Sequence, residues 1–291
     1  MSTFKASRES IIKFMHTKNW VSHFDSARAE IYDTNILKFI PGYQLFQSLI
    51  LDIISASGLQ APKILVIGAG TGTESLNLAR KFPQATIFAL DPSLDMLNKL
   101  SEKITQEQIT NIQLKHSYLA DLQEYNFDFV ISCLVMHFIP DELSHKTIDQ
   151  ELSKKSFLKQ AYDRMKPNAS LILVDKCVDE VDHDQIFSYW RSFQINSGKT
   201  AQEADDNIKL INTELPIVSS ARIMDLASEL GFTKIIKFFK ALHVEGLVMN
   251  RWYRDARGDI TGDALPHSVS LTADRTAISK SLRGFAILNI T

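Results

Sequence analysis

The sequence predicts an α/β protein in which a doubly wound, mostly parallel sheet is finished by a C-terminal antiparallel hairpin. Two observations support this fold class. Short, wholly apolar segments alternate with helical segments between about residues 64 and 175, as expected when helices cover both faces of a parallel sheet. Two later strand-like segments, 234–239 and 246–252, lie too close together for a crossover helix, so we expect them to pair antiparallel.

The N-terminal residues lack this alternation and predict helices. An apolar segment from Ile36 to Ile40 is stopped by Pro41 and Gly42, because proline cannot donate the backbone bond that would continue a helix. A second apolar helix is expected from Gln44 to Ser55. We therefore expect residues 1–60 to form a helical cap on the sheet.

The strands and helices of the sheet region follow in order. We expect Ser93 to cap the helix after the second strand, because its hydroxyl can accept a bond from a free backbone N–H. A later helix, 156–165, is expected to end at Pro167 and Asn168. The predicted strands are 64–67, 86–90, 111–114, 127–133 and 170–175, with further helices at 76–81, 185–211 and 218–230, the last closed by Gly231.

The chain divides into three parts on this reading. The cap is followed by a sheet domain at 61–253, which carries a helical insertion at about 180–215. The remaining residues, 254–291, form an extension that is polar and rich in turn residues before the strand-like segment GFAILNI. This segment can pair with a sheet edge, cover a site or contribute to a homodimer, and the sequence leaves these roles open.

Composition fits a soluble globular protein, with 45% apolar and 23% charged residues. A net charge of −2 gives no reason to expect nucleic acid or a membrane as partner. The N-terminus lacks the apolar core of a signal peptide, and the longest apolar run, 129–139, is about half a membrane span. The two cysteines, Cys133 and Cys177, fit neither a zinc site nor a disulfide framework. We therefore expect a cytoplasmic protein without a metal.

Three glycines directly follow the first strand. Gly68, Gly70 and Gly72 fall within five positions, in a loop that lies at the carboxyl edge of the sheet and leads into a helix. Ligands bind at this edge in open α/β folds, glycines allow a ligand to approach the backbone, and the helix N-terminus presents amide groups to it. The alternative is a tight strand–helix turn that binds nothing.

A carboxylate narrows the choice of ligand. Asp91 ends the second strand, 23 residues after Gly68, where it can accept both hydroxyls of a ribose. The alternative is an ordinary aspartate at a helix start. The dinucleotide fingerprint requires a glycine at position 73, where this sequence has Thr73. The spacing therefore favours S-adenosylmethionine over NAD.

Four segments resemble the motifs of the class I S-adenosylmethionine-dependent methyltransferases, in order and spacing: KILVIGAGTGTES, IFALDPSLDML, NFDFVISCLVMHFIPD and RMKPNASLILVD. The resemblance covers about residues 20–252 and implies a Rossmann-like sheet with S-adenosyl-L-methionine as cofactor. The segments HFDSARAEIYDTNILKFIPGY and RIMDLASELGF resemble a narrower group, which includes small-molecule methyltransferases and the carboxy-S-adenosylmethionine synthases that serve tRNA wobble modification.

The resemblance implies a set of cofactor contacts. Tyr43 is expected at the cofactor's amino-acid end and Cys133 beside its methionine part, while Asp91 holds the ribose hydroxyls. Pro92 is expected beside the adenine, and the backbone N–H of Leu119 on an adenine ring nitrogen. The candidate cofactor-binding residues are Tyr43, Gly68, Ala69, Gly70, Gly72, Glu74, Asp91, Pro92, Tyr118, Leu119 and Cys133.

Two positions depart from the family pattern. Val66 stands where most relatives carry an acidic residue, so Glu74 becomes the candidate for binding the methionine ammonium. Tyr118 replaces the aspartate that usually binds the adenine amino group, and it can stack or hydrogen-bond instead. These departures keep open a non-catalytic cofactor-binding protein, a sensor or a partner subunit.

His137 is the candidate catalytic residue. Methyl transfer depends mainly on positioning, and a general base helps when the acceptor is a hydroxyl or an acidic carbon. His137 follows the fourth strand, and an imidazole usually titrates near neutrality. The alternative is a histidine that only packs.

Aromatic residues of the insertion predict an acceptor pocket. Tyr189, Trp190 and Phe193 can roof it together with the N-terminal helices, although they can equally pack on the core. Further candidates for the roof are His23, Phe24 and Tyr32. The leading hypothesis is methyl transfer to a flat, weakly polar small molecule of the kind found in secondary metabolism.

A carboxy-S-adenosylmethionine synthase is the rival enzyme. The resemblance implies that such enzymes hold the transferred carboxylate with an arginine about one turn before a Gly-Phe pair, here Gly231 and Phe232. The aligned position is Leu226, and an apolar side chain cannot neutralise a carboxylate. Arg222, one turn earlier, is the remaining substitute.

Overall fold

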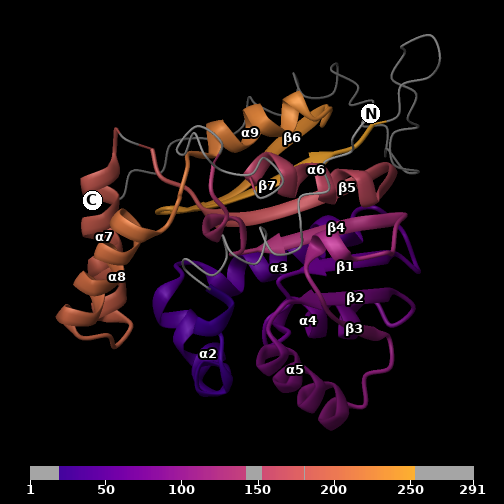
Figure 1. The fold of residues 1–291 in the computed structure, drawn as a ribbon, viewed down its shortest axis with the longest axis horizontal. Coiled ribbons are helices and arrows are strands. Elements are labelled where there is room, and N and C mark those ends of the chain that lie inside the picture. Colours follow the sequence, from indigo (N-terminus) through magenta and orange to yellow (C-terminus); the bar gives the residue numbers. More distant parts are fainter. Residues whose placement is uncertain (1–19, 142–152, 180, 253–291) are drawn as a thin grey trace, which may run out of the picture.

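The computed structural model describes residues 20–141, 153–179 and 181–252. Seven strands among them form one sheet in the order β3-β2-β1-β4-β5-β7-β6 (Figure 1). The start of the predicted cap, and the 254–291 extension with its predicted strand, lie outside the described residues.

Five strands of this sheet run parallel, and the last two form an antiparallel hairpin that pairs with β5. The fold class predicted from the sequence is therefore confirmed. The strands are β1 (Lys63–Ile67), β2 (Thr86–Asp91), β3 (Ile112–His116), β4 (Phe127–Cys133), β5 (Met165–Lys176), β6 (Lys234–Ala241) and β7 (Val244–Asn250).

Helices cover both faces of the sheet, which explains why the central strand β1 is almost wholly apolar. Along β1, Ile64 and Val66 pack with α3 (Tyr43–Ser55), α4 (Thr73–Lys81) and α5 (Leu94–Glu107). The alternate residues, Leu65 and Ile67, pack with α6 (Lys154–Arg164) and α9 (Ser220–Glu229). The strand order reverses between β1 and β4, and ligands of open α/β sheets bind outside the carboxyl ends of strands at such a point.

Helix boundaries agree with the sequence in most places and differ in two. Ser93 caps α5 as predicted, because its hydroxyl accepts from the backbone N–H of Met96 at 3.3 Å. The helix α6 ends at Arg164, three residues before Pro167, where the sequence predicted its end. The strand β5 already begins at Met165. The single helix predicted at 185–211 is two helices, α7 (His183–Asn196) and α8 (Ala201–Glu214).

The break between α7 and α8 has a local cause. Gly198 has a φ of +93°, a left-handed conformation that ends the first helix. Thr200 then forms a capping box with Glu203 and starts the second helix. The pair α7 and α8 builds a small apolar core of its own around Phe187, Trp190, Ile211 and Leu215.

The first cap helix, α2 (Ser26–Phe39), lies at the carboxyl edge of the sheet between α5 and α7 (Figure 1). Asp33 binds the α2 helix to the glycine loop, because its Oδ1 accepts from Thr71 Oγ1 at 2.6 Å and its Oδ2 pairs with Lys103. Ser93 Oγ donates to the carbonyl of Phe24 at 2.6 Å. These bonds hold the α2 helix over the edge where a ligand is expected.

No helix in the ranges 20–141, 153–179 and 181–252 is long and apolar enough to cross a membrane. Cys133 and Cys177 are both buried and unbridged.

Candidate functional site

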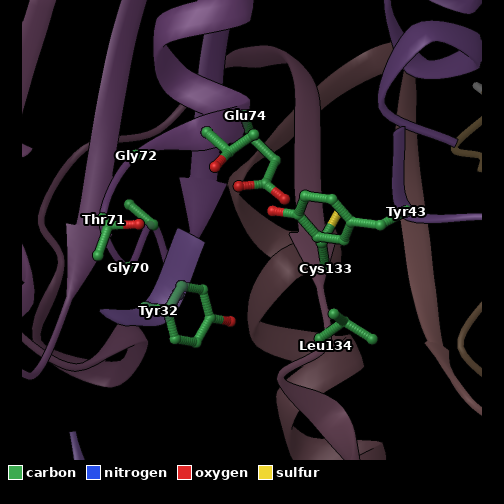
Figure 2. A pocket seen from close by; sticks show the side chains of 11 residues that line it. Tyr32, Tyr43, Gly70, Thr71, Gly72, Glu74, Cys133 and Leu134 are labelled. Atoms are coloured by element: carbon green, nitrogen blue, oxygen red, sulfur yellow. The ribbon is translucent and has the colours of Figure 1, made fainter. Parts of the chain in front are cut away.

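A pocket lies at the carboxyl ends of β1 and β4, beside α2 (Figure 2). Its walls come from the glycine loop, the start of α4, the end of β4 and one tyrosine from each of two cap helices. The lining residues are Tyr32, Tyr43, Gly68, Ala69, Gly70, Thr71, Gly72, Thr73, Glu74, Cys133 and Leu134. The structure thus brings together the predicted glycine loop, Tyr43, Glu74 and Cys133.

The three loop glycines share a positive φ but differ in what surrounds them. A Cβ on Gly68 would lie 2.3 Å from Val135 Cγ2, and one on Gly72 would lie 2.1 Å from Leu100 Cδ1, so both glycines are required by packing. Gly70 has a φ of +53° and no heavy atom within 4 Å of where its Cβ would lie. The open face of Gly70 therefore fits a close approach by a ligand rather than by the protein itself.

Asp91 is buried at the end of β2 and holds the loop. Its Oδ2 accepts from the backbone N–H of Gly70 at 2.8 Å, and its Oδ1 accepts from the N–H of Ser93 at 2.8 Å. Burial raises the pKa of Asp91, although both hydrogen bonds oppose this shift. An ionised carboxylate offers about four lone-pair positions. Two remain after these bonds, which fits the two hydroxyls of a ribose.

A second buried carboxylate, Glu74, lines the pocket itself, whereas Asp91 lies outside the lining and contacts it through Gly70. Its Oε1 accepts a hydrogen bond from Gln47 Nε2, and burial raises the pKa of Glu74. Figure 2 shows the Tyr43 hydroxyl directed toward the Glu74 carboxylate, and burial, followed by Glu74, raises the pKa of Tyr43. A buried anion without a cation is unfavourable. A ligand ammonium is therefore a fitting partner for Glu74.

Cys133 lines the same end of the pocket. Burial raises the pKa of the Cys133 thiol well above its usual value, with Glu74 and Asp175 adding to the shift. The side chain is therefore a neutral thiol at physiological pH.

The three residues predicted for the adenine lie outside the lining of this pocket. Leu119 is buried at the start of a 3-10 turn, η2 (Leu119–Asp121), while Tyr118 is 38% exposed. The carbonyl of Pro92 is 3.1 Å from His116 Nε2. All three follow β2 or β3 at the same sheet edge as Asp91, and their cofactor contacts stay predictions.

His137 lies in a short turn after β4, η3 (Met136–Phe138), and is 3% exposed. Its Nδ1 is 2.6 Å from Asp175 Oδ1, and Asp175 Oδ2 accepts from the backbone N–H groups of Met136 and His137. A carboxylate only accepts, so Nδ1 carries the proton and Nε2 is left as an acceptor. Asp175 therefore fixes the tautomer and the orientation of the ring.

The expectation that His137 titrates near neutrality is wrong. Burial, followed by the positive charge of Lys176, lowers the pKa of His137 to about 4, and the opposing effect of Asp175 is smaller. The imidazole is therefore neutral at physiological pH. Lys154 supports the same turn, because its Nζ donates to the carbonyls of Met136 at 2.8 Å and Ile139 at 2.6 Å.

The aromatic roof predicted from the insertion is not assembled as expected. Trp190 is fully buried, its Nε1 donates to the carbonyl of Phe39 at 2.8 Å, and its ring lies 4.4 Å from that of His243. Tyr189 is 51% exposed, while Phe193 packs beside the core of α7 and α8. The inner face of α7 is thus used for packing, and Tyr189 points to the surface.

The residues that matter for the rival enzyme are also placed. Leu226 is fully buried in the core beneath α9. Arg222, in the first turn of α9, pairs with Asp141 at 3.3 Å between Nε and Oδ2. The positive charge of Arg222 is thus already matched by a carboxylate of the protein.

Sequence reasoning missed several residues of this edge. Tyr32 was expected in an acceptor roof but lines the pocket, and Thr71 joins the loop to α2. The sequence predicts Asp175 only as the end of a strand and does not single out Lys176. Their signal was available, because charged residues after a buried central strand lie at the edge where ligands bind.

Comparisons with known proteins agree with this geometry. A family model described as a methyltransferase domain matches residues 64–154. A carboxy-S-adenosyl-L-methionine synthase of Helicobacter hepaticus is 25% identical, over 78% of this chain and 94% of its own. The same enzyme of Campylobacter hominis is 22% identical, over 75% and 89%. The fold also resembles that of magnesium protoporphyrin IX methyltransferase from Synechocystis, solved with bound SAH, with a TM-score of 0.53 and 15% identity over 74% of this chain and 85% of that one.

Proposed function

We propose that this chain, a class I S-adenosylmethionine-dependent methyltransferase, transfers the methyl group to a small-molecule acceptor that binds beside η3 and α2. The observation that carries the proposal is the pairing of the open face of Gly70 with Asp91. Packing accounts for the other two loop glycines. At Gly70 no packing contact requires a glycine, so its positive φ and the approach of a ligand are what favour one there.

The residues present fit S-adenosylmethionine. Asp91 has acceptor capacity left for the ribose hydroxyls, and Glu74 offers a buried carboxylate to the ammonium. When bound, the cofactor supplies a methyl group on a positively charged sulfur, so the chemistry is largely its own. The contribution of the protein is to position the acceptor and to exclude water.

His137 is the residue that we assign to the acceptor. Its Nε2 can accept a hydrogen bond or a proton from an acceptor hydroxyl, while Asp175 holds the ring through Nδ1. With a pKa of about 4, His137 is a weak base that is always available above that pH. We therefore assign it the orientation of the acceptor first and proton removal second.

Binding calorimetry tests the proposal. We expect the purified protein to bind S-adenosylmethionine and S-adenosylhomocysteine, and mass spectrometry of the freshly purified protein to detect either compound if it co-purifies. Gly70→Val is the matched control, because the branched side chain would fill the face left open in the loop. If the wild-type protein binds neither compound, the proposal is wrong.

A carboxy-S-adenosylmethionine synthase remains the second candidate, because the two curated relatives described above carry that name and are matched over 94% and 89% of their length. The pairing of Arg222 with Asp141 and the burial of Leu226 argue against it. We expect no carboxylated product when the protein is incubated with S-adenosylmethionine and prephenate. A carboxylated product that disappears in Arg222→Ala would show that the second candidate is right.

A further inference from the structure

We propose that Lys176 and Arg28 form an anion subsite that binds a carboxylate of the methyl acceptor, an inference that rests on the proposed function. Lys176 ends β5 and is 7% exposed, which is rare for a lysine without a partner. Within the part of the chain that the structure describes, its ammonium has no hydrogen bond or ion pair. Its Nζ instead lies 4.7 Å from the centre of the Phe39 ring.

The neighbouring carboxylate does not serve as the partner of Lys176. Asp175 attracts the ammonium electrostatically, but its two oxygens already accept from His137 Nδ1 and from the backbone N–H groups of Met136, His137 and Lys176. Asp175 is also shared with the buried ammonium of Lys154. The buried negative charge at this edge is thus matched without Lys176.

A second cation is close enough to Lys176 to repel it electrostatically. Arg28, on α2, lies with its guanidinium carbon 4.7 Å from the Phe24 ring centre, and it has no carboxylate partner among the residues described. Burial lowers the pKa of Lys176 to about 8; the attraction of Asp175 opposes this shift, and the charge of Arg28 adds to it by a smaller amount. The two cations repel each other, so an anion between them would remove the repulsion and supply the missing partner.

The location of Lys176 points to the acceptor. Val174, two residues earlier in β5, pairs with Cys133 of the cofactor pocket, and Lys176 itself does not line that pocket. Arg28 lies one turn before Tyr32, which does line the pocket. The two cations therefore lie beside the cofactor pocket, on the side where His137 is held.

Apart from Asp175, the groups that we find near the two cations are neutral histidines and aromatic rings. His137 is uncharged at neutral pH, and burial followed by Lys176 lowers the pKa of His243 to about 3. The ring of Phe138 lies 5.7 Å from that of Phe24 and 5.1 Å from that of Trp20. These rings suit a flat apolar body. The inferred acceptor class is therefore a small aromatic or apolar carboxylic acid, in place of the weakly polar acceptor expected from the sequence.

The test uses the full chain loaded with S-adenosylhomocysteine and three probes: benzoate, 4-hydroxybenzoate and cinnamate, each beside its methyl ester. We expect at least one carboxylate to bind roughly 10- to 150-fold more tightly than its ester, the range for a charged hydrogen bond. Lys176→Met and Arg28→Gln should each remove most of this preference. Lys159→Met, which removes an exposed lysine on α6, should keep it.

The cofactor also carries a carboxylate, so a second arm separates the two sources. Wild type and Lys176→Met are titrated with S-adenosylmethionine and with 5′-methylthioadenosine, which lacks the amino-acid part. For each ligand, we expect the wild type and Lys176→Met to have the same affinity. If Lys176→Met weakens only S-adenosylmethionine, the subsite holds the cofactor's carboxylate and the acceptor assignment is wrong.

Two outcomes of the probe panel also contradict the subsite. In the first, the wild type shows no preference for a carboxylate over its methyl ester. In the second, both Lys176→Met and Arg28→Gln keep the preference of the wild type. Failure of the proposed function looks different, because the wild-type protein would then bind no S-adenosylmethionine at all. Thermal unfolding checks the fold of Lys176→Met, which should be as stable as the wild type, since it replaces a buried ammonium by an apolar side chain.

Discussion

Replacing Asp91 by alanine should weaken the binding of S-adenosylmethionine and also destabilise the free protein. The two effects come from different acceptor positions of one carboxylate. Two positions accept from the backbone N–H groups of Gly70 and Ser93, both at 2.8 Å. The remaining positions are those that we assign to the ribose hydroxyls.

The expected loss of affinity follows from hydrogen bonds to a charged group. Such a bond contributes about 1.5–3 kcal/mol, so its loss should raise the dissociation constant roughly 10- to 150-fold. The stability loss follows from two backbone donors left without a partner, at about 1–3 kcal/mol for a fully buried one. The N–H of Ser93 is buried, while that of Gly70 is only partly buried and can reach water.

Calorimetry at a temperature where the Asp91→Ala variant is folded measures the first effect, and thermal unfolding measures the second. Asp128→Ala is the matched control, because Asp128 accepts from the backbone N–H of Lys63 at 2.8 Å and from Lys166 Nζ at 2.7 Å, at the start of β4. The control should lose stability and keep its affinity. Unchanged affinity in folded Asp91→Ala would remove this residue from the site and refute the reasoning.

Further predictions concern the glycine loop and two titratable groups. Gly70→Val should abolish S-adenosylmethionine binding and leave the circular dichroism unchanged. Gly72→Ala should instead lower the melting temperature, because its Cβ would lie 2.1 Å from a side chain. Normal binding by Gly70→Val would contradict the assignment of the loop to the cofactor. With the pKa of His137 at about 4, the methylation rate at saturating cofactor and acceptor should stay level from pH 7 to about 5. A fall near pH 6.5 would show that His137 is not the group described. Burial raises the pKa of Glu74, and pairing with an ammonium would lower it again, so the complex binds fewer protons than the free protein. The affinity for S-adenosylmethionine should therefore fall as the pH falls through the raised pKa. The variant Glu74→Gln should bind more weakly and lose this pH dependence.

The sequence predicted those features that depend on neighbours along the chain. The strands, the hairpin and the cap of α5 by Ser93 are local patterns, and the structure confirms them. The glycine loop and Asp91 also come together as expected, because consecutive parallel strands place their ends at one edge. Gly198 and the capping box at Thr200 and Glu203 are also local signals, and they indicate the break between α7 and α8. The helical pattern on both sides of the break predicts one continuous helix, which is wrong.

What the sequence did not reveal depends on contacts between distant segments. The pKa of His137 is set by burial and by Lys176, and its orientation by Asp175, 38 residues away. Trp190 is of a residue type that often lines ligand pockets. Its indole N–H instead donates to a carbonyl of α2, 151 residues away. Periodicity shows that a helix has an aromatic face but does not show whether protein or ligand covers it.

The distribution of charge also bears on the choice between the two enzymatic functions. A carboxylate subsite at Lys176 would attract a dicarboxylate such as prephenate, so carboxylate binding alone does not favour methyl transfer. A carboxyl group on the cofactor's sulfonium carbon must, however, be neutralised inside the cofactor pocket itself. The lining residues of that pocket include one buried carboxylate, Glu74, and no lysine, arginine or histidine. The described lining of this pocket thus offers no cation to a carboxylated sulfonium. Since Leu226 is buried in the opposite core, the charges of this edge suit the binding of an anionic acceptor beside an unmodified methyl donor.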